Sequence, residues 1–256
     1  MACPRCGAVA GRSTTGGLCP SCVLLESLDH TFDDDALPLD ERYEILNVLG
    51  GGPHGLTYLA RERAVPAKPL ALKILARGRK APGGEQLRSY LGSIRGLTGL
   101  RVAPVLDAGV SEDGRVYVAT EFVVGRHLTT YCASKRLGPG ERLQLVADVC
   151  TTIAGAHNRG LVHGHLVPSN VVVANGGEST IVMDVALAPL ALGSEINAAA
   201  DCQALANMVS TLLMPDGPVP ARRFDAARSM MTEALAACDT AAAIGAAARR
   251  VADGQT

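Results

Sequence analysis

The chain has 256 residues, which is enough for one substantial domain and a small additional one. Apolar residues make up 48% of it, so the sequence can build a large buried core and is not that of a disordered protein. Its formal net charge of −1 argues against the broad basic surface of a nucleic-acid-binding protein. No apolar run reaches the ~18–20 residues that a membrane helix needs, and the N-terminus lacks a signal peptide, so we expect a cytoplasmic protein with no membrane contact.

Four of the eight cysteines lie near the N-terminus in two CxxC pairs, Cys3/Cys6 and Cys19/Cys22, with twelve residues between the pairs. Each CxxC turn can direct two thiolates at one ion, and two such turns complete a tetrahedral Cys₄ site. Redox chemistry and an iron site are weaker alternatives. Residues 1–28 are therefore predicted to form a ribbon that folds around a structural Zn²⁺ ion, similar to the zinc ribbons of bacterial proteins.

Residues 29–40 are rich in aspartate and are predicted to be an acidic linker. Beyond them, apolar runs with strand character precede segments with helical character. The expected strands cover residues 43–49, 56–61, 70–75, 102–106 and 116–123, with a weaker helical pattern at 87–97. The expected helices cover 141–159, 201–213 and two alanine-rich segments after Pro220, and a short β-pair covers 171–174 and 180–183. This order predicts an α+β fold with a β-rich lobe at 41–124 and a helical lobe at 125–254.

A glycine-rich loop contains Gly50, Gly52 and Gly55 in a GxGxxG spacing. It falls between two expected strands, whereas a dinucleotide-binding loop falls between a strand and a helix. Ala71 and Lys73 follow in the next strand. A glycine hairpin followed by Ala-x-Lys is the arrangement found in protein kinases.

Further motifs extend the resemblance to bacterial Ser/Thr protein kinases over residues 41 to about 251. Glu121 and Val123 match the hinge, residues 163–170 match the catalytic loop, and Asp184-Val185-Ala186 matches the metal-binding DFG motif. Asp201 matches the buried acid near the start of a helix. The resemblance implies a bilobal kinase-like fold and a site for ATP with Mg²⁺, formed by Gly50, Gly52, Gly55, Ala71, Lys73, Glu121, Val123, Asn170 and Asp184.

The same alignment shows losses at positions that carry the chemistry. His165 stands where kinases have the catalytic aspartate, Gly164 replaces the preceding arginine and Val167 replaces the loop lysine. The acid of the C helix falls near Tyr90, which cannot pair with Lys73. Only sixteen residues separate Asp184 from Asp201, about half of a complete activation segment, and the Ala-Pro-Glu motif is missing. No residue is therefore assigned a catalytic role, and His165 is a degenerate position.

These losses predict a pseudokinase, a signalling scaffold or regulator that binds a protein partner the sequence does not identify. Lys73 and Asp184 favour nucleotide binding, whereas Pro53-His54 at the loop tip and the missing acid disfavour it. The alternatives are a divergent phosphotransferase or nucleotidyltransferase that uses Lys73, Asn170 and Asp184, and a zinc-ribbon protein that binds nucleic acid. Homodimerisation is compatible with the sequence but has no signature in it. The remaining cysteines are expected to be buried apolar residues in helices: Cys132, Cys150, Cys202 and Cys238.

Overall fold

The computed structural model describes residues 41–52, 55–76, 83–174, 179–187, 197–215 and 221–254. The predicted zinc ribbon and acidic linker lie outside these residues. The chain divides into two compact units, one comprising residues 1–82 and 106–122 and the other residues 83–105 and 123–256. The helical segment at 83–105 thus groups with the C-terminal part of the chain, although it lies between strands of the first unit in sequence.

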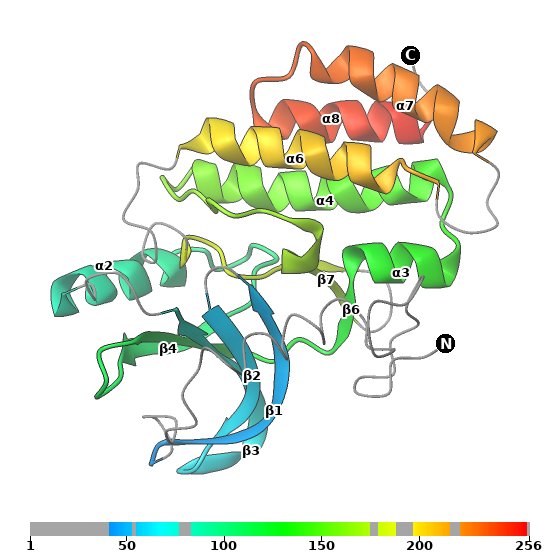
Figure 1. Ribbon diagram of the computed structural model, residues 1–256. Coiled ribbons are helices and arrows are strands. Elements are labelled where there is room, and N and C mark those ends of the chain that lie inside the picture. The colour runs from blue at the N-terminus through cyan, green and yellow to red at the C-terminus, as the bar shows by residue number, and fades with distance from the viewer. Residues whose placement is uncertain are drawn as a thin grey trace. The chain divides into compact units, whose positions relative to one another are not determined.

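The first unit is built on a five-stranded sheet in the order β1-β2-β3-β5-β4 (Figure 1). Neighbouring strands among β1, β2, β3 and β5 are antiparallel. The strands are β1 (Tyr43–Gly52), β2 (Gly55–Glu62), β3 (Val65–Leu75), β4 (Val105–Val110) and β5 (Val116–Glu121). Four of the five expected strands are confirmed. The fifth strand is present, but its predicted bounds of 102–106 were shifted: Pro104 lacks an N–H donor, and β4 begins after it, at Val105.

The core of this sheet follows the two-residue period of a strand, because alternate side chains point to the same face. On β2 and β3 the side chains of Tyr58, Ala60, Leu70, Leu72 and Ile74 are each at most 8% exposed. The intervening side chains on β3, including that of Lys73, point to the opposite face. This alternation leaves one face of β3 for the core and the other for a site.

A polar network joins β1 to β4, which stand at opposite ends of the strand order. The Asp107 Oδ2 atom accepts hydrogen bonds from Arg42 Nη1 at 2.7 Å, the Tyr117 hydroxyl at 2.9 Å and the Tyr43 hydroxyl at 3.1 Å. The Tyr43 and Tyr117 rings pack edge to face at 5.9 Å. Burial raises the pKa of both phenols, and the carboxylate of Asp107 raises them further. The network therefore curls the sheet and ties its two edges together.

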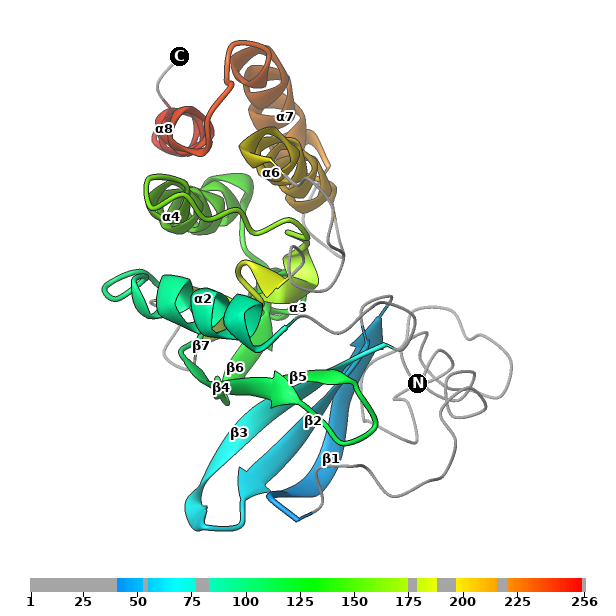
Figure 2. The same ribbon diagram turned by 90° about the vertical axis from the view of Figure 1, so that its left-hand side faces the viewer.

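The second unit is helical, and its helices α4, α6, α7 and α8 stack as neighbouring rods (Figure 2). Its helices are α2 (Gly84–Arg95), α3 (Leu128–Lys135), α4 (Pro139–His157), the 3₁₀ turn η2 (Pro168–Asn170), α6 (Ala198–Leu212), α7 (Arg222–Leu235) and α8 (Ala241–Ala252). Close packing of α8 on α4 requires Gly245, since a Cβ there would lie 2.8 Å from Cys150 Cβ. Of the helices that the structure describes, none combines the length and the apolar character needed to cross a bilayer.

Helix α4 begins earlier than the sequence pattern indicated. Pro139 occupies its first turn, where the missing N–H costs nothing, and Glu141 Oε2 accepts a hydrogen bond from the backbone N–H of Gly138 at 2.8 Å. The predicted helices at 87–97 and 201–213 and the two after Pro220 are confirmed as α2, α6, α7 and α8. Cys132, Cys150 and Cys202 are buried as predicted, but Cys238 is half-buried and lies between α7 and α8 instead of in a helix.

A small three-stranded sheet in the order β6-β7-β8 lies beside these helices. It comprises β6 (Gly125–His127), β7 (Val171–Ala174) and β8 (Thr180–Val182), so the predicted β-pair is confirmed. The segment after α2 joins this sheet, because Ala103 N–H donates to Val182 O and Val182 N–H donates to Arg101 O, both at 2.9 Å. The sheet thereby holds the loop before β7 and the turn after β8 close together.

Candidate functional site

The glycine-rich loop is a β-hairpin, as the sequence predicted. Gly52 pairs with Gly55, and Gly50 pairs with Thr57 of β2. Gly55 has a φ of +132°, and a Cβ there would lie 2.0 Å from Ile74 O, so this position requires glycine. A Cβ at Gly50 would instead meet none of the described atoms within 4 Å beyond its chain neighbours, so there is open space beside β1 at this position.

Lys73 lies at the centre of the same sheet. It pairs with Thr57 of β2 and with Val118 of β5, and Ala71 lies two residues away on the same face of β3. Glu121 is the last residue of β5 and pairs with Leu70. The first unit thus holds six of the predicted nucleotide-binding residues on one sheet: Gly50, Gly52, Gly55, Ala71, Lys73 and Glu121.

The other predicted residues belong to the second unit, where Val123 precedes β6, Asn170 ends the η2 turn and Asp184 follows β8. The loop that carries Asn170 is supported from behind by Asp201 of α6, which is 1% exposed. The two carboxylate oxygens of Asp201 accept the backbone N–H groups of His163 and Gly164, each at 2.8 Å. His157 Nε2 at the end of α4 lies 2.9 Å from the same carboxylate.

His163 is fully buried beneath the loop. Its Nε2 atom lies 2.9 Å from the carbonyl oxygen of Met183, and its Nδ1 atom accepts a hydrogen bond from the His165 N–H at 3.3 Å. Burial lowers the pKa of His163, and the nearby carboxylates of Asp201 and Asp184 offset this only in part. A neutral His163 therefore links the loop to the residue that precedes Asp184.

The front of the loop carries His165, the degenerate position. Asn170 Nδ2 donates to the carbonyl oxygen of His165 at 2.9 Å, and the Asn170 carbonyl accepts the Met183 N–H at 2.8 Å. The first bond uses the nitrogen of the Asn170 amide and leaves its side-chain oxygen as an available metal ligand. Asn170 thus holds the backbone of the loop and connects it to the end of β8.

Asp184 begins a tight turn with an unusual backbone conformation. Asp184 and Ala186 have φ values of +58° and +56°, and Leu187 N–H donates to Asp184 O at 3.2 Å. The left-handed region is unfavourable for a residue with a Cβ and is readily adopted by glycine. Ala186 therefore occupies a glycine conformation at the position where kinases carry the glycine of the DFG motif.

Tyr90 of α2, the residue that stands at the acid position of the C helix, is 8% exposed. Its pKa is raised by burial and, to a smaller extent, by the negative charge of Asp184. The phenol therefore lies within the electrostatic reach of Asp184, the predicted metal ligand. Sequence reasoning identified the loss of the acid but missed this neighbour, and it also missed His157 as a partner of Asp201.

The predicted zinc ligands can be compared with the structure only where it describes the chain. Within the described residues, three or more histidine, cysteine, aspartate or glutamate side chains do not gather into a metal-binding group. Cys3, Cys6, Cys19 and Cys22 lie outside those residues, so the zinc ribbon stays a prediction from spacing. Pro53 and His54, which the sequence pattern assigns to the loop tip, lie outside them as well.

The sequence of the chain is similar to those of several Ser/Thr protein kinases. No protein-family model matches the chain. It is 29% identical over 160 residues to the Ser/Thr protein kinase pkn2 of Myxococcus xanthus, covering 61% of the chain and 19% of that kinase. It is 32% identical over 140 residues to the Ser/Thr protein kinase PrkC of Bacillus subtilis, covering 53% of the chain and 21% of that kinase.

A plant relative extends this similarity beyond bacteria. CBL-interacting protein kinase 17 of Oryza sativa is 31% identical over 142 residues, covering 54% of the chain and 31% of that protein. The chain thus matches about a fifth to a third of the length of each of these relatives. Together with the glycine hairpin, the lysine strand and the Asp201-supported loop, these matches show that the chain has a protein-kinase-like fold and is a homologue of Ser/Thr protein kinases.

Proposed function

We propose that this chain is a pseudokinase, which does not transfer a phosphoryl group and acts by binding a partner protein. The observation that carries the proposal is the contrast within one loop. Its backbone is fixed by Asp201, as a catalytic loop requires, but the side chain it presents at the base position is the imidazole of His165.

The chemistry of phosphoryl transfer explains why this replacement matters. In protein kinases the loop aspartate accepts the proton of the substrate hydroxyl, and cationic groups neutralise the charge that develops on the transferred phosphate. A neutral imidazole can accept a proton but supplies no negative charge. Val167 supplies no cation at the position of the loop lysine. The loop therefore lacks both the negative charge of the aspartate and the positive charge of the lysine.

Nucleotide binding is the part of kinase function that the remaining residues support. Lys73 would contact phosphate oxygens, and the side-chain oxygens of Asn170 and Asp184 are ligands that Mg²⁺ prefers. A bound Mg²⁺ ion would neutralise phosphate charge. Thermal unfolding with increasing ATP and Mg²⁺ tests this part, because a ligand that binds the native state raises the melting temperature with concentration. We expect the rise to be lost in Lys73→Ala.

The N-terminal ribbon is proposed to bind one structural zinc ion through Cys3, Cys6, Cys19 and Cys22. Support comes from the spacing of the two CxxC pairs, which matches that of Cys₄ zinc sites. Elemental analysis of the purified chain should give one zinc per molecule, and replacement of Cys3 and Cys6 by serine should remove it. A zinc content unaffected by these replacements would contradict the proposed ligands.

The absence of phosphoryl transfer is tested with ATP labelled at the γ or the α phosphate and a mixture of acceptor proteins. We expect no label transfer above the level of Asp184→Ala, which lacks the metal-binding carboxylate. Transfer of the γ label that is lost in Asp184→Ala would support a divergent phosphotransferase. Transfer of the α label with the same dependence would support a nucleotidyltransferase.

A further inference from the structure

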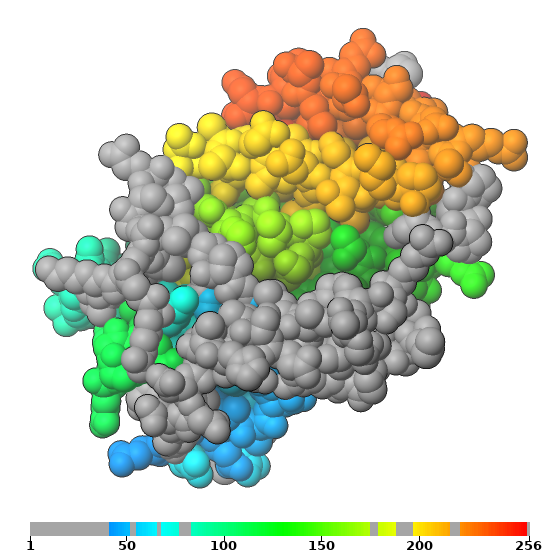
Figure 3. All heavy atoms as spheres, in the orientation of Figure 1, coloured from blue at the N-terminus to red at the C-terminus, as the bar shows by residue number. Residues whose placement is uncertain are grey.

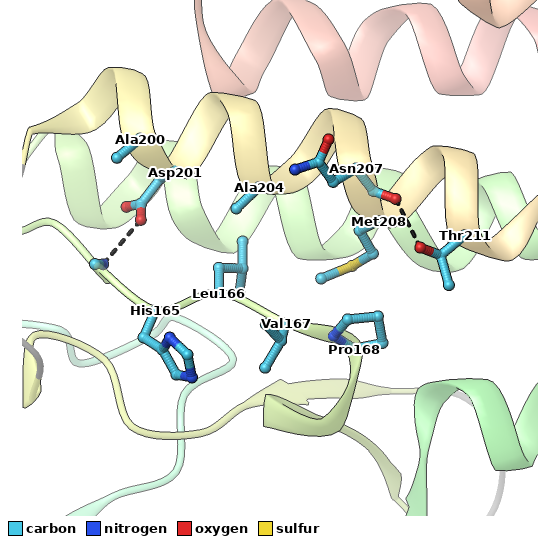
Figure 4. A pocket seen from close by; sticks show the side chains of 11 residues that line it. His165, Leu166, Val167, Pro168, Ala200, Asp201, Ala204, Asn207, Met208 and Thr211 are labelled. Atoms are coloured by element: carbon cyan, nitrogen blue, oxygen red, sulfur yellow. Dashed lines mark hydrogen bonds between the residues drawn. The ribbon is translucent and has the colours of Figure 1, made fainter. Parts of the chain in front are cut away.

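A pocket of about 400 Å³ lies in the second unit between the catalytic loop and α6 (Figure 4). Leu166 and Met208 line it with largely buried side chains, at 4% and 1% exposure, while Ala200 and Ala204 face it from successive turns of α6. Because these two alanines carry only a methyl group, the helix leaves space above the loop. Figure 3 shows this face of the unit, with α6 in yellow above the yellow-green residues that include the loop.

The described lining of the pocket holds two side chains that can carry a charge, Asp201 and His165. Asp201 is the one acidic residue among the described residues that line it, and its carboxylate is occupied by two backbone N–H groups and His157. Lysine and arginine are absent from the same described lining. A cation entering this pocket would lose its hydration without gaining an unoccupied carboxylate from the described lining, and an anion would meet only the imidazole of His165, so the pocket favours an uncharged occupant.

The rim carries hydrogen-bonding groups suited to a peptide backbone. Asn207 is exposed on α6, and its side-chain oxygen already accepts a hydrogen bond from Gln203 Nε2 at 3.2 Å, which leaves the amide nitrogen to donate. The Thr211 hydroxyl donates to the Asn207 carbonyl at 2.9 Å, which leaves its oxygen to accept. One donor and one acceptor thus stand a helical turn apart beside the apolar side chains of Leu166 and Met208.

We propose that this pocket binds an extended, uncharged segment of a partner protein, with an aliphatic side chain against Leu166 and Met208 and its backbone along Asn207 and Thr211. The inference deepens the proposed pseudokinase function, on which it rests, by giving the partner's binding site and its chemistry. In sequence, only sixteen residues separate Asp184 from Asp201, about half of a complete kinase activation segment. A shortened segment offers less of the chain itself to cover this face of α6, which favours an occupant from another protein.

The test uses a displayed library of random dodecapeptides selected on the intact chain. Selected peptides should share uncharged residues around an aliphatic position, and Ala204→Phe should weaken their affinity at least ~10-fold by filling the pocket. Ala200→Phe, at an exposed position on the same face, provides a second variant should Ala204→Phe fail to fold. Ala226→Phe on the exposed face of α7 is the matched control and should leave affinity unchanged.

Two results of the selection would overturn the inference: peptides that bind Ala204→Phe and Ala200→Phe as tightly as the native chain, or peptides that share charged residues. Displacement of the selected peptides by a synthetic peptide of residues 188–196 would also overturn it. So would a dimer in which a second copy of the chain occupies the pocket, which light scattering would detect. If the peptide test fails and no label is transferred from ATP, the pseudokinase proposal stands, and the partner protein binds at a different surface. Label transfer would overturn the pseudokinase proposal itself.

Discussion

The loop at residues 163–170 keeps the kinase pattern in its buried contacts with α6 and the end of β8 but not in the side chains at the positions that carry out catalysis in kinases. Behind the loop, Asp201 holds two backbone N–H groups and His163 is buried against Met183. At the front, His165 and Val167 replace the residues that handle a proton and a phosphate. The difference teaches that packing and chemistry are separable constraints, since the buried contacts are needed for folding whether or not the loop catalyses a reaction.

The largest effect on stability should come from removing the carboxylate of Asp201, which holds the backbone of the loop. Asp201→Ala deletes the acceptor of two backbone N–H groups and leaves them and His157 without their buried partner. We expect the free energy of unfolding to fall by about 3 to 5 kcal/mol, because each buried donor left without an acceptor costs about 1–3 kcal/mol. Urea unfolding followed by circular dichroism measures it.

The matched control is Asp225→Ala on α7, where the carboxylate is 58% exposed and paired with Arg228. Its loss should change the free energy of unfolding by less than ~1 kcal/mol, the range of exposed ion pairs. Equal effects for the two substitutions would show that Asp201 does not support the loop.

The glycine hairpin of the first unit offers a similar comparison. Gly55 and Gly50 lie in the same hairpin, but only Gly55 occupies a position that excludes a Cβ. Gly55→Ala would force a Cβ against Ile74 O in a conformation that alanine rarely adopts, and we expect a loss of about 2 to 3 kcal/mol. Gly50→Ala meets open space and should cost less than ~0.5 kcal/mol. Thermal unfolding of the two variants separates them, and similar losses would show that the hairpin does not require a specific glycine.

The buried back of the loop should also make stability depend on pH. His163 has a pKa lowered by burial, so the unfolded chain binds a proton that the folded chain excludes. Its contribution to stability is therefore present at high pH and lost as the pH falls below the ordinary histidine pKa of ~6.5. Between pH 6 and 5, the free energy of unfolding should fall by up to ~1.4 kcal/mol per pH unit more in the native chain than in His163→Gln.

Parallel curves of unfolding free energy against pH for the native chain and His163→Gln would contradict this assignment. The remaining titratable groups, among them Asp201, Asp184 and His157 around this site, are common to both chains. The difference between the two curves therefore reports on His163.

The smallest effect should come from the turn after Asp184 and should be a gain in stability. Ala186→Gly relieves a φ of +56°, which costs alanine ~1–2 kcal/mol, while glycine adds conformational entropy to the unfolded chain. We expect a net stabilisation of about 0.5 to 1 kcal/mol in urea unfolding. Ala226→Gly, within the exposed part of α7, should instead destabilise by about 1 kcal/mol. A loss of stability in Ala186→Gly would show that the turn does not strain Ala186.

The sequence predicted most of the elements and the order of the kinase motifs, because strand and helix periodicity, glycine spacing and Lys73 are local signals. It misplaced the bounds of β4, since the apolar run at 102–106 outweighed Pro104, and it placed Cys132 in a helix without giving the bounds of the short helix α3. The interactions of Asp184 with Tyr90 and of Asp201 with His157 join residues far apart in the chain. Such interactions depend on tertiary packing, which periodicity in a single sequence does not reveal.

The most direct test of the pseudokinase proposal follows the fate of ATP in a single turnover, with the chain in excess over labelled nucleotide and Mg²⁺ present. This measurement needs no knowledge of the acceptor, since any transfer consumes ATP and releases ADP or pyrophosphate. We predict that ATP is consumed no faster than with Asp184→Ala. Consumption of ATP that is faster than in Asp184→Ala, and that is lost when His165 is replaced by alanine, would show that the loop catalyses transfer and would contradict the proposal.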